Sequence, residues 1–257
     1  MKFVIGGALT ILSWDNPVTA FFRKSKKLRH SLGRPSRSDF VHFQYDEQLE
    51  KFEVVGGSIM TEKEKAAAGY LYNANYDEEI LNEISRCNDL CHEFNQIKPS
   101  DREAQGEILK QILGTMGEQV TVNTPFWCDY GYNTSVGNYF FANHNCQILD
   151  GGKVTFGDHV FIAPNCLFTT AEHALDAEQR NEGLEVALPI AVGNNVWIGA
   201  GTIVLGGVTI GDNTVIGAGS VVTKSIPSNV IAVGVPCRVV REITAADKER
   251  YPVYRGE

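Results

Sequence analysis

A single histidine lies in a stretch that interrupts an otherwise regular part of this sequence. His173 lies in the segment TTAEHALD, from Thr169 to Asp176, and Glu, Asp, Arg and Asn are frequent from there to Leu188. Histidine side chains titrate at about pH 6.5, which makes histidine the usual general base at neutral pH. Loops held on a rigid scaffold often carry catalytic residues. The residue type and its setting therefore indicate proton transfer by His173, with a surface histidine without a role as the alternative.

A six-residue repeat between Val192 and Pro227 predicts the scaffold that holds this loop. The units read VGNNVW, IGAGTI, VLGGVT, IGDNTV, IGAGSV and VTKSIP, and an aliphatic residue opens each one. This period fits neither an amphipathic helix nor a simple alternating strand, and it is typical of a parallel β-helix. Units in the same phase occur at 136–138 and 156–167, so we expect a β-helix domain over 116–243 with an inserted loop at 169–188. The residues expected to stack in its core are Val192, Ile198, Val204, Ile210, Ile216 and Val222.

The residues before the solenoid are predicted to form a small helical domain at 60–115. Thr61 and Glu64 form a capping box, apolar residues recur at threes and fours from Ile80 to Phe94, and Asp101 starts a further helix. This domain has too little core to be stable alone. We therefore expect it to pack on the end of the β-helix and cap it. Residues 244–257 are predicted to be a polar tail.

Residues 1–59 differ in character from the rest of the chain. Met60 begins a segment that looks like a fresh amino terminus, so we expect 1–59 to be an extension that is disordered or not part of the functional protein. A targeting segment is the alternative, because the run from Phe3 to Trp14 is apolar. That run is shorter than the roughly 20 residues that a membrane-spanning helix needs.

Charge and cysteine content narrow the class of protein. The net charge of −8 argues against a nucleic-acid-binding protein, which would present a basic face. The six cysteines are scattered, which favours a reduced, cytoplasmic protein without a disulfide framework. We also expect no membrane partner. Cys87 and Cys91 share one face of a predicted helix, but without a second cysteine pair we expect no metal site there.

Several segments resemble one enzyme family. They are FANHNCQILD, VTFGDHVFIAPNC, TTAEHALDAEQR, PIAVGNNVWIGAGTIVLGGVTIGDNTVIGAGSVVTKSIP and AVGVPCRVVREI, with KEKAAAGYLYNANYDEEI before them. The chain from Met60 to about Lys248 resembles the maltose and galactoside O-acetyltransferases of the hexapeptide-repeat acyltransferase superfamily. The resemblance implies a mainly β fold, a left-handed parallel β-helix with a small N-terminal helical domain. It also implies acetyl transfer from acetyl-CoA to a sugar hydroxyl, in a homotrimer with active sites between adjacent solenoids.

The resemblance also implies roles for individual residues. His173 would be the general base, Glu185 a candidate to orient it, and Asn143 a donor to the transition state and a contact of the cofactor. A backbone N–H near Ala200 would assist Asn143, and Trp197 would wall the acceptor site, unless its indole only fills a corner of the solenoid. The acceptor would contact Asp129 and Asn73, although Asn75 or Asp77 could replace Asn73. The implied cofactor contacts are Asn143, Ala200, Ala218, Thr223, Lys224, Arg238 and Arg241.

Three other interpretations remain open at this stage. A zinc hydratase of the γ-carbonic anhydrase type would need three histidines, and His144, His159 and His173 are available, but the paired HxxxxH spacing of that family is absent. A non-catalytic trimeric β-helix scaffold would leave the loop around His173 unexplained. Within the acetyltransferases, a non-sugar acceptor such as serine or a xenobiotic is the nearest alternative to a sugar.

Overall fold

The computed structural model describes residues 2–5, 8–11, 43–46, 51–54 and 60–254, and the chain divides into the compact units Met1–Met60 and Thr61–Glu257. In the first unit, β1 (Lys2–Ile5) pairs antiparallel with β2 (Ala8–Ile11), and β3 (Phe43–Asp46) pairs antiparallel with β4 (Lys51–Val54). The expectation of a disordered extension, and the alternative of a targeting segment, otherwise fall on residues outside the described ranges.

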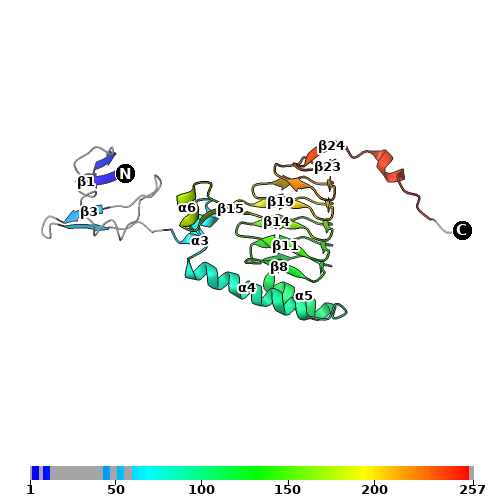
Figure 1. Ribbon diagram of the computed structural model, residues 1–257, viewed down its shortest axis with the longest axis horizontal. Helices are drawn as coiled ribbons and strands as arrows, with labels where there is room; N and C mark the ends of the chain where they lie inside the picture. The colour runs from blue at the N-terminus through cyan, green and yellow to red at the C-terminus, as the bar shows by residue number, and fades with distance from the viewer. Residues whose placement is uncertain (1, 6–7, 12–42, 47–50, 55–59, 255–257) are drawn as a thin grey trace. The chain divides into compact units, whose positions relative to one another are not determined.

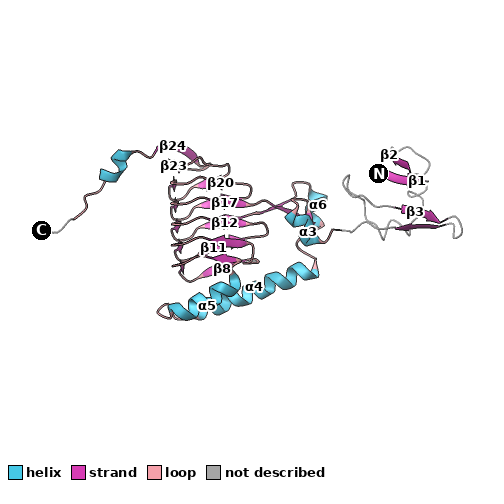
Figure 2. Cartoon of the chain, turned by 180° about the vertical axis from the view of Figure 1, so that it is seen from behind, coloured by secondary structure: helices cyan, strands magenta, loops and turns pink. Residues whose placement is uncertain are grey.

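The second unit is built on a β-helix whose three faces are parallel sheets (Figures 1 and 2). Successive strands of the chain visit the three sheets in turn, and each strand pairs with the strand one coil later. The first sheet holds β6 (Thr115–Met116), β9 (Thr134–Val136), β12 (Val154–Phe156), β17 (Ile190–Val192) and β20 (Thr209–Ile210). The second holds β7 (Thr121–Val122), β10 (Phe141–Ala142), β13 (Phe161–Ile162), β18 (Trp197–Ile198), β21 (Val215–Ile216) and β23 (Val230–Val233), with β24 (Arg238–Glu242) antiparallel at its edge. The third holds β8 (Phe126–Cys128), β11 (Cys146–Leu149), β14 (Leu167–Thr169), β19 (Ile203–Leu205) and β22 (Val221–Val222).

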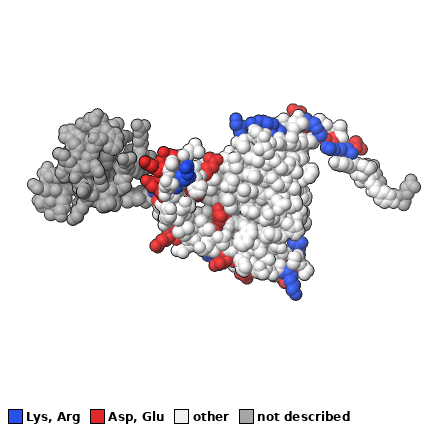
Figure 3. All heavy atoms as spheres, in the orientation of Figure 1, with Lys and Arg blue, Asp and Glu red and all other residues white. Residues whose placement is uncertain are grey.

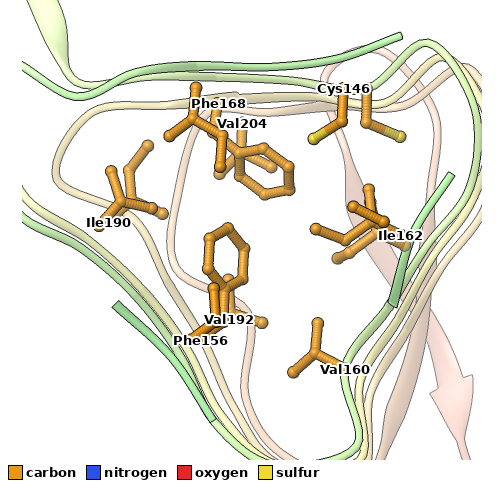
Figure 4. Close-up of a cluster of buried hydrophobic side chains, with 14 of the residues drawn as sticks. Cys146, Phe156, Val160, Ile162, Phe168, Ile190, Val192 and Val204 are labelled. Carbon is orange, nitrogen blue, oxygen red and sulfur yellow. The ribbon is translucent and has the colours of Figure 1, made fainter. Parts of the chain in front are cut away.

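The interior of the β-helix is a stack of apolar side chains, as the repeat predicts. All six predicted unit openers are buried. Figure 4 shows Phe156 and Phe168 meeting at the centre of the prism, and their rings lie edge to face with centroids 5.0 Å apart. The hydroxyl group of buried Thr202 donates to the carbonyl of Gly199 at 2.7 Å, which satisfies a polar group inside the core. Hydrophobic burial along the axis therefore holds the coils in register.

One corner of each coil is fixed by a ladder of Asp and Asn side chains. The carboxylate of Asp158 accepts the backbone N–H of Asn138 at 2.7 Å, and Asn194 accepts that of Asp158 at 2.9 Å. Coils approach so closely here that a Cβ atom on Gly157 would lie 2.5 Å from Oδ1 of Asn194. Asparagines also take positive φ at another set of corners, as expected for this residue type.

Two helices cover the N-terminal end of the β-helix, α4 (Glu78–Gln96) and α5 (Arg102–Ile112), while the short α3 (Glu62–Ala67) lies beside the inserted segment (Figure 1). The Thr61 side chain and Glu64 form the predicted capping box at the start of α3, and Asp101 caps α5. The buried face of α4 includes Phe94, whose ring lies edge to face on Phe126 of β8, with centroids 6.2 Å apart. Helices and solenoid therefore share one hydrophobic core.

The inserted segment has regular structure of its own. It contains β15 (Ala171–His173), α6 (Ala177–Asn181) and β16 (Leu184–Ala187), and β16 pairs antiparallel both with β15 and with β5 (Tyr72–Asn73). The helical prediction for 60–115 missed β5, because two residues are too few to show a strand pattern. After β24 the chain forms the 3₁₀ helix η1 (Ala245–Glu249). Within the described residues, none of the helices combines the length and apolar character that crossing a membrane requires.

Candidate functional site

The small antiparallel sheet places His173 beside a carboxylate. His173 lies opposite Glu185 in the pairing of β15 with β16, and Glu185 lies opposite Tyr72 in the pairing of β16 with β5. Nδ1 of His173 is 3.9 Å from Oε2 of Glu185, while the hydroxyl group of Tyr72 donates to Oε1. The imidazole is 53% exposed and the carboxylate only 12%. The largely buried carboxylate of Glu185 thus lies next to the imidazole of His173, which is exposed to solvent and accessible to a ligand.

Tyr72 belongs to this site although the sequence analysis did not single it out. Burial, followed by its hydrogen bond to Glu185, raises the pKa of the phenol, so the hydroxyl group remains a proton donor to the carboxylate. The bond fixes one carboxylate oxygen and leaves the other facing His173. The segment LYNANYD around Tyr72 resembles the family, but only the tertiary pairing shows which of its side chains contacts Glu185.

Asp129 lies at the end of β8, close to the same carboxylate. Burial raises its pKa to about 7, and the nearby negative charges of Asp150 and Glu185 act in the same direction. Asp150 accepts hydrogen bonds from the backbone of Tyr130 at 2.9 Å and from the hydroxyl group of Thr134 at 2.9 Å. None of the causes that raise the pKa of Asp129 is a hydrogen bond to its carboxyl group from the described residues. Asp129 is therefore the carboxyl group of this cluster that is available to a ligand.

Asn73 lies on the neighbouring strand but its side chain is engaged. Its Oδ1 accepts the backbone N–H of Tyr76 at 3.0 Å, and its own N–H donates to Glu62 at 2.6 Å. Asn75 is exposed beyond it, and Asp77 caps α4 through a hydrogen bond to Ile80. The structure thus gives Asn73 and Asp77 clear local roles in this turn.

Asn143 and Trp197 lie at a different corner of the prism from His173. Asn143 follows β10 and precedes β11, whereas the segment with His173 leaves the solenoid beyond the other end of that sheet, after β14. Oδ1 of Asn143 accepts the N–H of His144 at 2.8 Å, which leaves the amide NH₂ as the free donor. Trp197 is 55% exposed on β18, so it is not a buried corner filler. The described protomer therefore does not bring Asn143 and Trp197 together with His173.

Apart from Asn143, the predicted cofactor contacts gather over the last coils. Ala200, Ala218, Thr223 and Lys224 are all exposed at turns of the solenoid, and Arg238 and Arg241 are exposed on β24. Figure 3 shows Lys and Arg side chains over this end, while Asp and Glu side chains gather around α3 and α6. The end that carries the predicted cofactor contacts is thus basic, and the region around the segment with His173 is acidic, a distribution that suits a polyanionic ligand at the basic end. No group of three His, Cys, Asp or Glu residues in the described ranges could hold a metal ion.

Family models match two parts of the chain. The maltose acetyltransferase hexapeptide capping motif matches residues 65–117, and the bacterial transferase hexapeptide model, with six repeats, matches residues 189–224. A protein of Saccharomyces cerevisiae assigned as an acetyltransferase is 47% identical over 184 residues, covering 72% of this chain and 94% of that protein. A Staphylococcus aureus protein with the same kind of assignment is 50% identical, covering 72% and 92%.

Two solved structures are similar over nearly their full length. A maltose O-acetyltransferase from Clostridium difficile 630 is 50% identical with a TM-score of 0.70, covering 72% of this chain and 98% of that chain. A galactoside acetyltransferase in complex with coenzyme A is 43% identical with a TM-score of 0.72, covering 77% and 99%. The six-residue repeats, the capping helices and these relatives agree. The chain therefore belongs to the hexapeptide-repeat acetyltransferases of the maltose and galactoside type, which fold as a left-handed β-helix.

Proposed function

We propose that this protein transfers an acetyl group from acetyl-CoA to a hydroxyl group of a sugar, with His173 as the general base. The observation that carries the proposal is the placement of His173 against Glu185 by the sheet of β15, β16 and β5. A sugar acceptor is supported by the capping motif and by relatives named for maltose and galactoside. The donor is supported by the coenzyme A bound to one of those relatives and by the basic end of this chain.

In this reaction, His173, Glu185 and Asn143 each have a separate role. Acetyl-CoA supplies a thioester carbonyl that a hydroxyl oxygen can attack. His173 accepts the hydroxyl proton on the ring nitrogen that faces away from Glu185 as the new C–O bond forms, and returns it to the thiolate sulfur as the C–S bond breaks. Glu185 stabilises the imidazolium formed in between. The free amide NH₂ of Asn143 donates to the negative charge that develops on the carbonyl oxygen.

We further propose that the active site is shared between protomers of a homotrimer. His173 and Asn143 lie at different corners of one solenoid, so one protomer would supply His173 and its neighbour Asn143 and Trp197. A test is to co-express His173→Ala and Asn143→Ala chains. In a random mixture, about one interface in four carries both intact residues, so the whole population of trimers should regain roughly a quarter of the wild-type activity. Absence of any recovery, with trimers formed, would place both residues in one protomer's site.

The reaction is tested by the release of free CoA thiol from acetyl-CoA, with glucosides, galactosides, maltose and serine as acceptors. We expect release with sugars, and a fall in kcat of about 10² to 10⁴ in His173→Ala. Release with serine alone would identify a non-sugar acceptor. No release with any acceptor, or an unchanged rate in His173→Ala, would contradict the mechanism and favour a scaffold.

A further inference from the structure

The C-terminal segment folds back onto one of the two arginines of β24. Asp247 of η1 faces Arg241, with Oδ1 2.6 Å from Nη2 and Oδ2 2.8 Å from Nη1. Nη1 also donates to the backbone carbonyl of Glu242 at 2.9 Å. Arg238 has no comparable restraint, since its guanidinium bonds only to the carbonyl of Cys237 among the described residues. The two arginines are therefore held very differently.

Counting donors shows which edge of Arg241 remains available. A guanidinium group carries five N–H donors, and three of them are used by Asp247 and Glu242. The unused donors are Nε–H and the second N–H of Nη2. These two are neighbours on one edge of the planar group and point in parallel, as bidentate binding of two phosphate oxygens requires. Asp247 thus occupies one edge of Arg241 without blocking the other.

Asp247 is itself fixed in place. Its Oδ2 accepts the backbone N–H of Thr244 at 2.9 Å, which closes the first turn of η1. The hydrogen bonds from Arg241, followed by that from Thr244, hold the pKa of this carboxyl group below its usual range, so it is ionised at neutral pH. A carboxylate anchored on the backbone on one side can orient a long, flexible arginine side chain on the other.

We propose that Asp247 is a positioning residue for the donor substrate, holding the guanidinium of Arg241 so that its free edge binds the terminal phosphate group of the CoA moiety. This inference rests on the proposed function and on the implied cofactor contacts Arg238 and Arg241, whose guanidinium groups suit the phosphate oxygens of the CoA moiety. An arginine that is already ordered loses less side-chain freedom when phosphate binds, so the contact with Asp247 strengthens donor binding. The acetyl transfer step itself does not involve Asp247.

The test compares Asp247→Asn with Glu249→Gln, which removes the same charge from the same short helix but from a side chain with no bond to Arg241. The Asn amide oxygen can still accept the N–H of Thr244, which preserves η1. We expect Asp247→Asn to raise the KM for acetyl-CoA by about 3- to 10-fold with kcat unchanged. The KM for dephospho-acetyl-CoA, which lacks the terminal phosphate, should not change. Glu249→Gln should behave as the wild type with both donors.

An unchanged KM in Asp247→Asn would overturn the inference, and a lowered KM would show that Asp247 instead competes with the phosphate for Arg241. Arg241→Ala separates this failure from a failure of the proposed function. If Arg241→Ala raises the KM for acetyl-CoA while Asp247→Asn does not, Arg241 binds the donor without needing Asp247. If Arg241→Ala leaves the KM for acetyl-CoA unchanged in an enzyme that turns over, Arg241 does not bind the phosphate. The inference about Asp247 is then wrong as well. In the Arg241→Ala background, Asp247→Asn should add nothing.

Discussion

Glu185 connects three segments of the chain through one side chain. Its carboxylate meets His173 from the inserted segment and Tyr72 from the capping region, and it sits on the strand between them. In the proposed mechanism, this carboxylate stabilises the protonated imidazole. It therefore matters to the rate of the chemical step more than to the binding of either substrate.

Glu185→Gln should lower kcat by about 10- to 100-fold, less than the full loss of general base catalysis. The KM for acetyl-CoA should not change, because Glu185 contacts His173 and Tyr72 and is not among the implied cofactor contacts. Glu172→Gln is the control, since Glu172 is exposed on the same strand next to His173. Steady-state kinetics of both variants check this. Equal effects of the two substitutions would show that only net charge matters.

The buried carboxyl group of Asp129 should make stability depend on pH. Its pKa is raised from 3.8 to about 7, by burial first and then by Asp150, Glu185 and Cys91, which face it from neighbouring elements. The folded protein therefore holds a proton that the unfolded chain has released, and this contribution to stability falls as the pH rises from about 4 to about 7.

Asp129→Asn removes this titration, so the variant should gain stability relative to the wild type as the pH rises. Allowing for partial solvent exposure, we expect a relative gain of about 1 to 2 kcal/mol between pH 5 and pH 8. Urea unfolding at both pH values measures it. Asp89→Asn, on the exposed face of α4, controls for the loss of one charge. The same free energy difference at pH 5 and pH 8 would show that Asp129 does not titrate in this range.

At the scale of elements, a glycine at the corner of the β-helix has no room for a side chain, whereas a glycine in a capping helix does. Gly157 sits where adjacent coils nearly touch, and an added Cβ would also lie 2.9 Å from the backbone carbon of Gly193. Gly106 lies within α5, and an added Cβ there would meet nothing within 4 Å. The same substitution should therefore have opposite effects at the two positions.

Gly157→Ala should lower the free energy of unfolding by about 1 to 3 kcal/mol, because backbone atoms of the next coil cannot move aside. Gly106→Ala should raise it by roughly 0.5 to 1 kcal/mol, because alanine favours the helix. Denaturant unfolding of both variants is the measurement. A Gly157→Ala protein as stable as the wild type would show that the coils can separate at this corner.

At the scale of the whole molecule, one face of the β-helix exposes aromatic side chains in a row. Phe141 and Phe161 lie next to each other along the second sheet, with tilted rings whose centroids are 6.4 Å apart, and Phe161 is in register with Trp197. Phe161 is 50% exposed. A row of exposed aromatic groups is typical of a surface that another protein chain covers. It runs beside the corner that carries Asn143, as a shared active site requires.

If this face forms the interface of the proposed trimer, Phe161→Glu should weaken the assembly, because it would place a charge in that interface. Light scattering coupled to size-exclusion chromatography should show a lower mass for this variant, and its activity should fall with the trimer content. Thr155→Glu is the control, since Thr155 is exposed on a strand of the first sheet. A Phe161→Glu protein of unchanged mass would place the subunit interface elsewhere.

The sequence alone determined the solenoid, because a six-residue period places the same residue type inward at every coil. The unit openers from Val192 to Val222 are buried, and the helices capped by Thr61 and Asp101 form where the pattern predicts them. His173 and Glu185 could be named from the sequence, but their contact could not be derived from spacing. It depends on a β-hairpin in the inserted segment.

The tertiary structure alone decided the rest of the site. Tyr72 reaches Glu185 through a strand of two residues, and Asp247 reaches Arg241 through a turn of the tail. Each of these contacts joins residues that no periodic pattern relates. Repeats encode the scaffold because identical units stack in one way, whereas the site consists of single contacts between segments that depart from the repeat.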